Sequence, residues 1–199
     1  MPRRNDEGSG SEGGAESGER KPKQRARIAV SSASLGEVAL SYLNRRDASR
    51  EKLVKHLEQW IRRRGTPEDP REARPLIQEL ASRYQESGLI NDDRLAKNAL
   101  DSLRSRGASS RAIAYKLKAR GVDASVIDAT MAHEKRESRG AELDAARALV
   151  KKKRMGSLRP EAERAANRRR DLAALARAGF DFDTARRALG GSAESDDEF

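Results

Sequence analysis

Shifted by 60 residues, this chain matches its own sequence, and this internal repeat limits its possible folds more than any other feature. Six residues of the first copy, Ala39, Leu40, Leu43, Arg46, Ala48 and Ser49, recur as Ala99, Leu100, Leu103, Arg106, Ala108 and Ser109. A further shift, of 58 residues, aligns Leu117, Gly121, Val122, Asp123 and Met131 with Leu175, Gly179, Phe180, Asp181 and Leu189. Two successive matches at nearly one period predict three copies of one small unit. Such arrays usually present a long surface to a partner and rarely enclose a reaction.

The spacing of the apolar residues predicts that each unit is helical. The first stripe, from Leu35 to Leu43, follows the i, i+3, i+4 pattern of one buried helix face, and Ser34 with Glu37 predicts a capping box at its start. Capping residues and helix-ending glycines or prolines predict further helices from Ser49 to Gly65, Pro70 to Gly88, Asn91 to Gly107, Ser109 to Gly121, and onward from Asp123. The third unit is expected to hold helices over 143–153, 160–178 and 183–189. No segment shows the alternation of a strand.

The predicted fold is therefore all-α, with three tandem three-helix repeats between disordered N- and C-terminal tails. The expected divisions are a tail over 1–33, repeats over 34–90, 91–137 and 138–190, and an acidic tail over 191–199. The tails lack hydrophobic periodicity, so nothing in them offsets the entropy lost on ordering. A basic cluster at 20–27 is equally consistent with a contact to a nucleic-acid backbone and with a solubilising tail.

Composition narrows the possible functions. Hydrophobic residues make up 36% of the chain and aromatic residues 4%, so each unit is expected to have a thin core. The net charge is +10, and residues 36–190 alone hold 35 Lys/Arg against 23 Asp/Glu, which favours partners rich in phosphate or acidic side chains. The absence of cysteine excludes disulfides and thiol catalysis. No apolar run approaches the roughly 20 residues of a membrane span, and no secretory signal is visible, so we expect a cytoplasmic protein.

The residues with catalytic potential do not form a recognisable site. Asp92 and Asp93 have no partner carboxylates or histidines in a metal-binding pattern, and they are expected to stabilise the start of a helix capped by Asn91. His56 and His133 are isolated, and His56 is expected at the boundary of a basic face. We therefore expect no enzyme activity, no cofactor and no metal.

The basic residues form a stronger pattern, because many fall on the helix faces opposite the apolar stripes. The candidate contact residues for a partner or for DNA are Arg45, Arg46, Arg50, Lys52, Lys55, Arg62, Arg104, Arg106, Arg111, Lys118, Arg120, Lys151, Lys152, Lys153, Arg154, Arg168, Arg169 and Arg170. If the units stack alike, these residues form one surface that neutralises phosphates with little sequence preference. The alternative is a set of ordinary solvated faces, since Glu51, Glu58, Asp101 and Asp128 interrupt them.

Base stacking would in addition require exposed aromatic rings. Tyr42, Trp60 and Tyr84 fall on apolar stripes and are expected in the core, whereas the pattern leaves Tyr115 and Phe182 open. A helix-turn-helix reader of DNA sequence fits poorly, because the helix that follows Asp123 opens without base-reading side chains.

Four local motifs, in this order and spacing, resemble the RecX family of recombinase regulators. They are the segment 39–53 (ALSYLNRRDASREKL), the segment 88–96 (GLINDDRLA), the segment 118–122 (KARGV) and the segment 177–180 (RAGF). Leu95 departs from the family pattern, in which an aromatic residue is more common at that place. The resemblance covers about residues 36–190.

The resemblance implies a curved, elongated array of three three-helix units without catalytic residues or cofactor. It also implies a protein that binds the RecA recombinase filament, restrains its ATPase and strand-exchange activities and alters filament growth. We expect a monomer with weaker, non-specific binding to single- and double-stranded DNA. Two other functions remain open on the residues alone: a general nucleic-acid-binding scaffold, and an adaptor for another protein complex.

Overall fold

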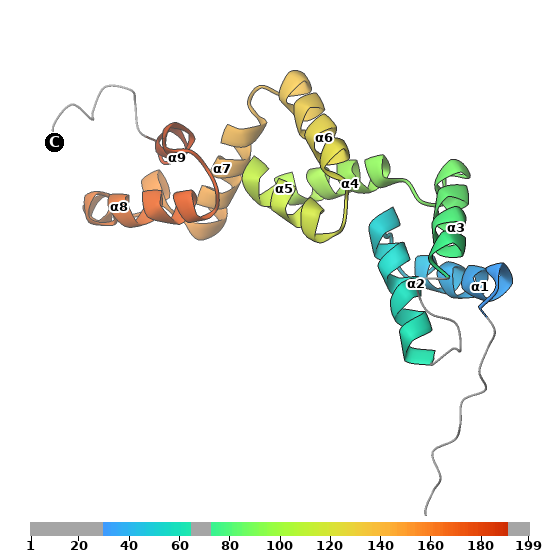
Figure 1. Cartoon of the computed structure of the whole chain (residues 1–199). Helices are drawn as coiled ribbons and strands as arrows, with labels where there is room; N and C mark the ends of the chain where they lie inside the picture. The colour runs from blue at the N-terminus through green and yellow to red at the C-terminus, as the bar shows by residue number, and fades with distance from the viewer. Residues whose placement is uncertain (1–29, 65–72, 191–199) are drawn as a thin grey trace, which may run out of the picture.

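The structure is a computed structural model, and it describes residues 30–64 and 73–190. Within these ranges it contains nine α-helices, one short 3-10 helix and no strand (Figure 1). The helices are α1 (Ser32–Leu43), α2 (Arg50–Arg64), α3 (Arg74–Glu86), α4 (Asp92–Arg104), α5 (Ser110–Ala119), α6 (Ala124–Glu137), α7 (Ala141–Lys153), η1 (Gly156–Leu158), α8 (Glu161–Arg177) and α9 (Phe182–Ala188). None of these helices is long and apolar enough to cross a membrane.

The helices form three successive units, each around its own hydrophobic cluster. Unit 1 comprises α1–α3, unit 2 comprises α4–α6, and unit 3 comprises α7–α9. The units follow one another along an elongated row (Figure 1). Leu57 and Leu117, which the repeat aligns, are fully buried in units 1 and 2. The predicted all-α fold of three three-helix repeats is confirmed.

Most helix starts lie where the capping residues predict them. The side chains of Ser49, Asn91, Ser109 and Asp123 each accept a hydrogen bond from a backbone N–H in the first turn of the following helix. The start of the first helix was predicted wrongly: Ser31 is the N-cap, and its capping box is completed by Ser34. The two serines satisfy the N–H groups of Ser31 and Ser34, one turn earlier than the predicted pair of Ser34 and Glu37.

The third helix also begins later than expected, at Arg74, with Pro75 in its first turn. The predicted start at Pro70 lies outside the described residues, as do Gly65 and the segments 1–29 and 191–199.

A buried serine joins each unit to the next through the same pair of hydrogen bonds. At joint 1, between units 1 and 2, the Oγ of Ser49 accepts from the N–H of Lys52 and donates to the carbonyl oxygen of Arg120, 2.8 Å away. At joint 2, between units 2 and 3, Ser109 accepts from Ala112 and donates to the carbonyl of Ala178 at 2.6 Å. Each hydroxyl therefore caps the second helix of one unit and satisfies the last turn of the second helix in the next.

An acidic side chain completes each joint. Asp92, in the first turn of α4, accepts a hydrogen bond from the N–H of Arg50 at 3.1 Å. Glu142, in the first turn of α7, accepts from the N–H of Ser110 at 3.0 Å. In both joints, an acidic side chain on the first helix of one unit thus accepts a hydrogen bond from a backbone N–H at the start of the second helix of the preceding unit. Asp92 and Asp93 lie in the first turn of α4, where the sequence predicts them, and Asp92 also accepts a hydrogen bond from the start of α2.

One of the aligned positions at which the two joints differ is held by Asp47 in unit 1 and by Gly107 in unit 2. Gly107 has a φ of +79°, and a Cβ there would lie 2.8 Å from the backbone nitrogen of Leu149 in α7. No side chain can occupy that space, so α7 closes directly against the end of α4. At joint 1 the side chain of Asp47 occupies the corresponding position, and it lines an open groove.

Candidate nucleic-acid interface

The groove at joint 1 has a volume of about 840 Å³ and is strongly basic. Its walls come from the turn before α2, from α2 itself, from α4 and from the end of α5. The charged or titratable residues that line it are Arg46, Asp47, Lys52, Lys55, His56, Arg106 and Arg120. Five cations thus face one carboxylate, and all five are among the residues predicted from the sequence.

Local sequence explains how these side chains converge. Lys52 and Lys55 lie one turn apart on α2, whose opposite face buries Leu53 and Leu57 in the core of unit 1. Arg120 is the C-cap of α5, and its carbonyl is fixed by Ser49.

The repeat supplies the other two cations. Arg46 and Arg106 are aligned by the 60-residue shift, and they follow the first helix of units 1 and 2 respectively. The joint brings both of them to the same groove.

Tyr42 and His56 form an aromatic stack in the wall of the groove. The ring centroids are 4.0 Å apart with an interplanar angle of 16°, and the Arg46 guanidinium carbon lies 5.3 Å from the Tyr42 centroid. Burial lowers the pKa of His56, and the positive charges of Arg63 and Arg46 lower it further. His56 is therefore neutral at pH 7. Its expected place at the edge of the basic face is confirmed.

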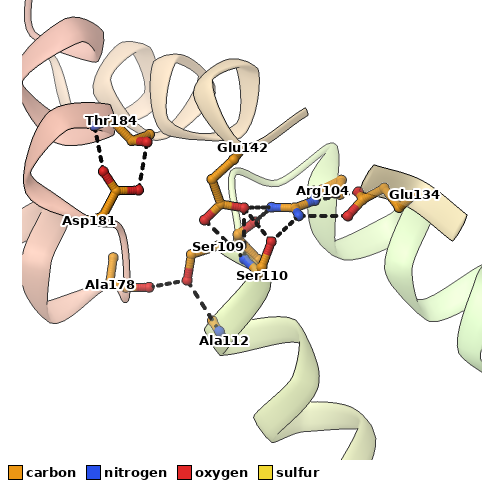
Figure 2. A network of polar contacts seen from close by, with 10 residues as sticks. Arg104, Ser109, Ser110, Ala112, Glu134, Glu142, Ala178, Asp181 and Thr184 are labelled. Carbon is orange, nitrogen blue, oxygen red and sulfur yellow. Dashed lines mark hydrogen bonds and ion pairs between the residues drawn. The ribbon is translucent and has the colours of Figure 1, made fainter. Parts of the chain in front are cut away.

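Arg104 does not belong to an exposed basic surface, and that prediction is wrong. Its side chain is only 11% exposed, and its guanidinium binds Glu134 at 2.6 Å and Glu142 at 2.7 Å (Figure 2). It also donates to the hydroxyl of Ser110 and the carbonyl of Ala108. Burial acts to lower the pKa of Arg104, but the hydrogen bonds to Glu134 and Glu142 and their negative charges raise it overall. Its spacing on α4 places it on the face turned towards α6 and α7.

Three more predicted contact residues have partners within unit 1. The guanidinium of Arg50 donates to Gln78 at 2.7 Å and thereby links α2 to α3. Arg62 pairs with Glu58 at 3.8 Å, and Lys55 forms an ion pair with Glu51. Arg45 lines a neighbouring hollow with Trp60 and Arg63. These pairs leave Arg50 directed away from the groove, whereas Lys55 still lines it.

The remaining candidates lie away from the groove. Arg111 and Lys118 are exposed on α5. Four exposed cations end α7 and three lie on α8: Lys151, Lys152, Lys153, Arg154, Arg168, Arg169 and Arg170. That these residues share one surface with the groove cations remains a prediction.

The opposite face of α4 has a different character. A hollow of about 590 Å³ there is lined by four acids, Asp101, Glu134, Glu137 and Asp144, by the cations Lys97 and Arg104, and by apolar residues such as Leu100. The groove and this hollow thus lie on two sides of α4, and cations outnumber acids in the groove but not in the hollow.

Sequence reasoning missed two polar residues of the groove, Asn98 and Ser102. The repeat aligns Ser102 with Tyr42, which also lines the groove, but the sequence alone predicts Tyr42 in the core. Within the described ranges, no three His, Asp or Glu side chains are grouped so that they could hold a metal ion.

Comparison with known proteins places this geometry in a family. Residues 91–131, which include α4 and α5, match the family model described as RecX, second three-helix domain. The regulatory protein RecX of Myxococcus xanthus is 38% identical over 176 residues, covering 86% of this chain and 91% of that protein. The RecX of Halorhodospira halophila is 33% identical over 171 residues, covering 85% and 94%.

A solved structure supports the same assignment of the fold. The crystal structure of RecX from Lactobacillus salivarius superposes with a TM-score of 0.59 at 17% identity, covering 79% of this chain and 94% of that one. The sequence relatives cover most of both chains, and the repeated three-helix architecture agrees with them. The chain therefore belongs to the RecX family of regulatory proteins.

Proposed function

We propose that this protein is a non-enzymatic regulator that binds the RecA recombinase filament and restrains its ATPase activity, strand exchange and growth. It acts as a monomer in the cytoplasm, and the groove at joint 1 contacts the DNA of the filament. The single observation that carries the DNA contact is the convergence of five cations against one carboxylate in this groove. The RecA partner is supported by membership of the RecX family.

The chemistry of the groove suits a phosphate backbone. Cations spread over two units can neutralise several phosphates at once, and the counterions released make such binding steeply salt-dependent and little dependent on sequence. The groove is open, so a chain of phosphates can lie along it. A filament on DNA presents such a chain together with protein surfaces.

A titration of RecA ATPase activity tests the proposal. The triple variant Lys52→Ala, Arg106→Ala, Arg120→Ala removes three groove cations, and Lys151→Ala, Lys152→Ala, Lys153→Ala removes three exposed cations at the end of α7. We expect the groove variant to need at least about tenfold more protein for half-inhibition and to show a flatter salt dependence of binding. The α7 variant controls for net charge and is expected to change far less. Circular dichroism verifies that both variants keep their helices.

The competing function is a scaffold that coats nucleic acid in general. It predicts that ATP hydrolysis falls only when bare single-stranded DNA is saturated with the protein, which the same titration with and without RecA measures. Inhibition that follows coverage of the DNA, or equal effects of the two triple variants, would contradict the proposed function.

A further inference from the structure

Two aromatic rings at joint 2 lie mostly in solvent. Tyr115 of α5 is 75% exposed and Phe182 at the start of α9 is 65% exposed. By contrast, Tyr42, Trp60 and Tyr84 pack against the cluster of unit 1. Packing within the units therefore does not explain why Tyr115 and Phe182 are aromatic.

The repeat gives Tyr115 the position on α5 that a groove residue has on α2. Under the 60-residue shift Tyr115 corresponds to Lys55, which lines the groove at joint 1. The core residues keep the same correspondence, since Leu57 and Leu117 are both fully buried. A ring at joint 2 thus occupies the place of a phosphate-binding cation at joint 1.

The start of α9 approaches the same helix. Gly179 lies three residues before Phe182, and a Cβ on it would lie 3.3 Å from the Cβ of Arg111 in α5. Arg111 and Tyr115 are four residues apart and share one face of α5. Joint 2 therefore brings the turn before Phe182 against the helix face that bears Tyr115.

The surroundings of Tyr115 carry only positive formal charge along α5. This helix contains no Asp or Glu, and its exposed cations are Arg111, Lys116 and Lys118. The nearby acids have other partners: Asp181 binds the backbone and hydroxyl of Thr184, and Glu142 binds Arg104 and Ser110 (Figure 2). Exposed rings among exposed cations are typical of surfaces that bind single-stranded nucleic acid.

We propose that joint 2 binds unpaired bases of single-stranded nucleic acid, which stack on Tyr115 and Phe182 while the cations of α5 contact the phosphates. This inference rests on the proposed function and deepens it, because it extends the phosphate groove of joint 1 with a site for bases. A duplex keeps its bases stacked on one another, so the rings select a single strand. Stacking on an aromatic face tolerates any base, which suits a protein without sequence preference.

The test compares two oligonucleotides of one length, oligothymidine and an abasic strand with the same phosphates, in fluorescence anisotropy with the full chain. We expect Tyr115→Ala to weaken binding of oligothymidine at least about fivefold, the lower end of what one stacked base contributes. Binding of the abasic strand and the salt dependence are expected to stay unchanged. Tyr115→Phe keeps a flat ring and is expected to bind like the original protein, whereas Phe182→Ala shows a similar loss.

Leu158→Ala is the matched control, because Leu158 is 53% exposed but belongs to η1 in unit 3. Equal affinity of the original protein for the two strands, or normal oligothymidine binding by Tyr115→Ala, would overturn the stacking proposal. Normal oligothymidine binding together with weaker inhibition of RecA would assign the rings to a protein contact. The groove triple variant tests the proposed function separately, since it changes the salt dependence and Tyr115→Ala does not.

Discussion

The two joints are built from the same contacts but differ in how firmly they are closed. Both use a buried serine and an acidic side chain from the next unit. Joint 2 adds the buried network around Arg104 and the direct approach of α7 to Gly107. Within the described residues, no ion pair joins units 1 and 2 at joint 1, which leaves a groove of about 840 Å³. A repeat can therefore supply a rigid joint and an accessible binding site through changes at very few positions.

The largest expected loss of stability comes from a substitution that breaks the network at joint 2. Arg104→Ala leaves Glu134 and Glu142 without their shared cation in a site with little solvent, so we expect a loss of about 3–5 kcal/mol in the free energy of unfolding. Arg106→Ala, two residues away and exposed, is expected to change it by less than about 0.5 kcal/mol. Denaturant melts measure both variants. Similar melts would mean that the network does not hold units 2 and 3 together.

A second substitution addresses the close approach of α7. Gly107→Ala combines an unfavourable positive φ with a Cβ 2.8 Å from the backbone of Leu149. Gly88→Ala has a φ of +73° but no heavy atom within 4 Å of the added Cβ, so it reports the cost of the backbone conformation alone, about 1–2 kcal/mol. We expect Gly107→Ala to lose clearly more stability than Gly88→Ala, and amide hydrogen exchange to accelerate in α7. Equal losses would show that joint 2 can adjust to an added methyl group.

The last pair of substitutions concerns the acidic residues of the two joints. Asp92→Asn at joint 1 is expected to raise the free energy of unfolding slightly, and Glu142→Gln at joint 2 is expected to lower it. Burial raises the pKa of Asp92, although the hydrogen bond from the N–H of Arg50 opposes this. A raised pKa in the folded state means that this group contributes stability below its ordinary pKa and loses it as the pH rises through the folded value. At pH 7 the charge on Asp92 thus opposes folding. Asp92→Asn keeps an oxygen acceptor for Arg50, so we expect a gain of at most about 1 kcal/mol at pH 7 that disappears near pH 3.

Glu142→Gln is the counterpart at joint 2. It removes one carboxylate from Arg104, and we expect it to lower the free energy of unfolding at pH 7. Melts of both variants across this pH range provide the comparison. A loss of stability in Asp92→Asn would show that the charge at joint 1 is favourable despite its burial.

The sequence was sufficient to predict the helices and their grouping because these depend on local signals. Apolar spacing and capping residues act within one or two turns, so Ser109 and Asn91 could be assigned as N-caps directly. The starts of α1 and α3 were exceptions: two serines replaced the expected pair of serine and glutamate at α1, and α3 begins only at Arg74. The five groove cations were also among the predicted residues, since helix faces follow from periodicity.

What could not be predicted is which cations face one another across a joint. Arg104 and Arg106 are two residues apart and look equivalent in sequence, yet one lies in a buried network and the other in the groove. The partners of Arg104 lie 30 and 38 residues away along the chain, on α6 and α7. Their positions depend on how units 2 and 3 pack, and no local pattern reports that.

The helix α5 depends on both of its neighbours. Its first turn is satisfied by Glu142 of unit 3, and the carbonyl at its last turn accepts from Ser49 of unit 1. Cutting the array on either side of the middle unit would consequently remove the hydrogen-bond partner of a backbone group at one end of α5. Unit 2 is therefore expected to fray when produced alone, and any dissection of this protein for binding studies should retain the flanking segments around residues 49 and 142.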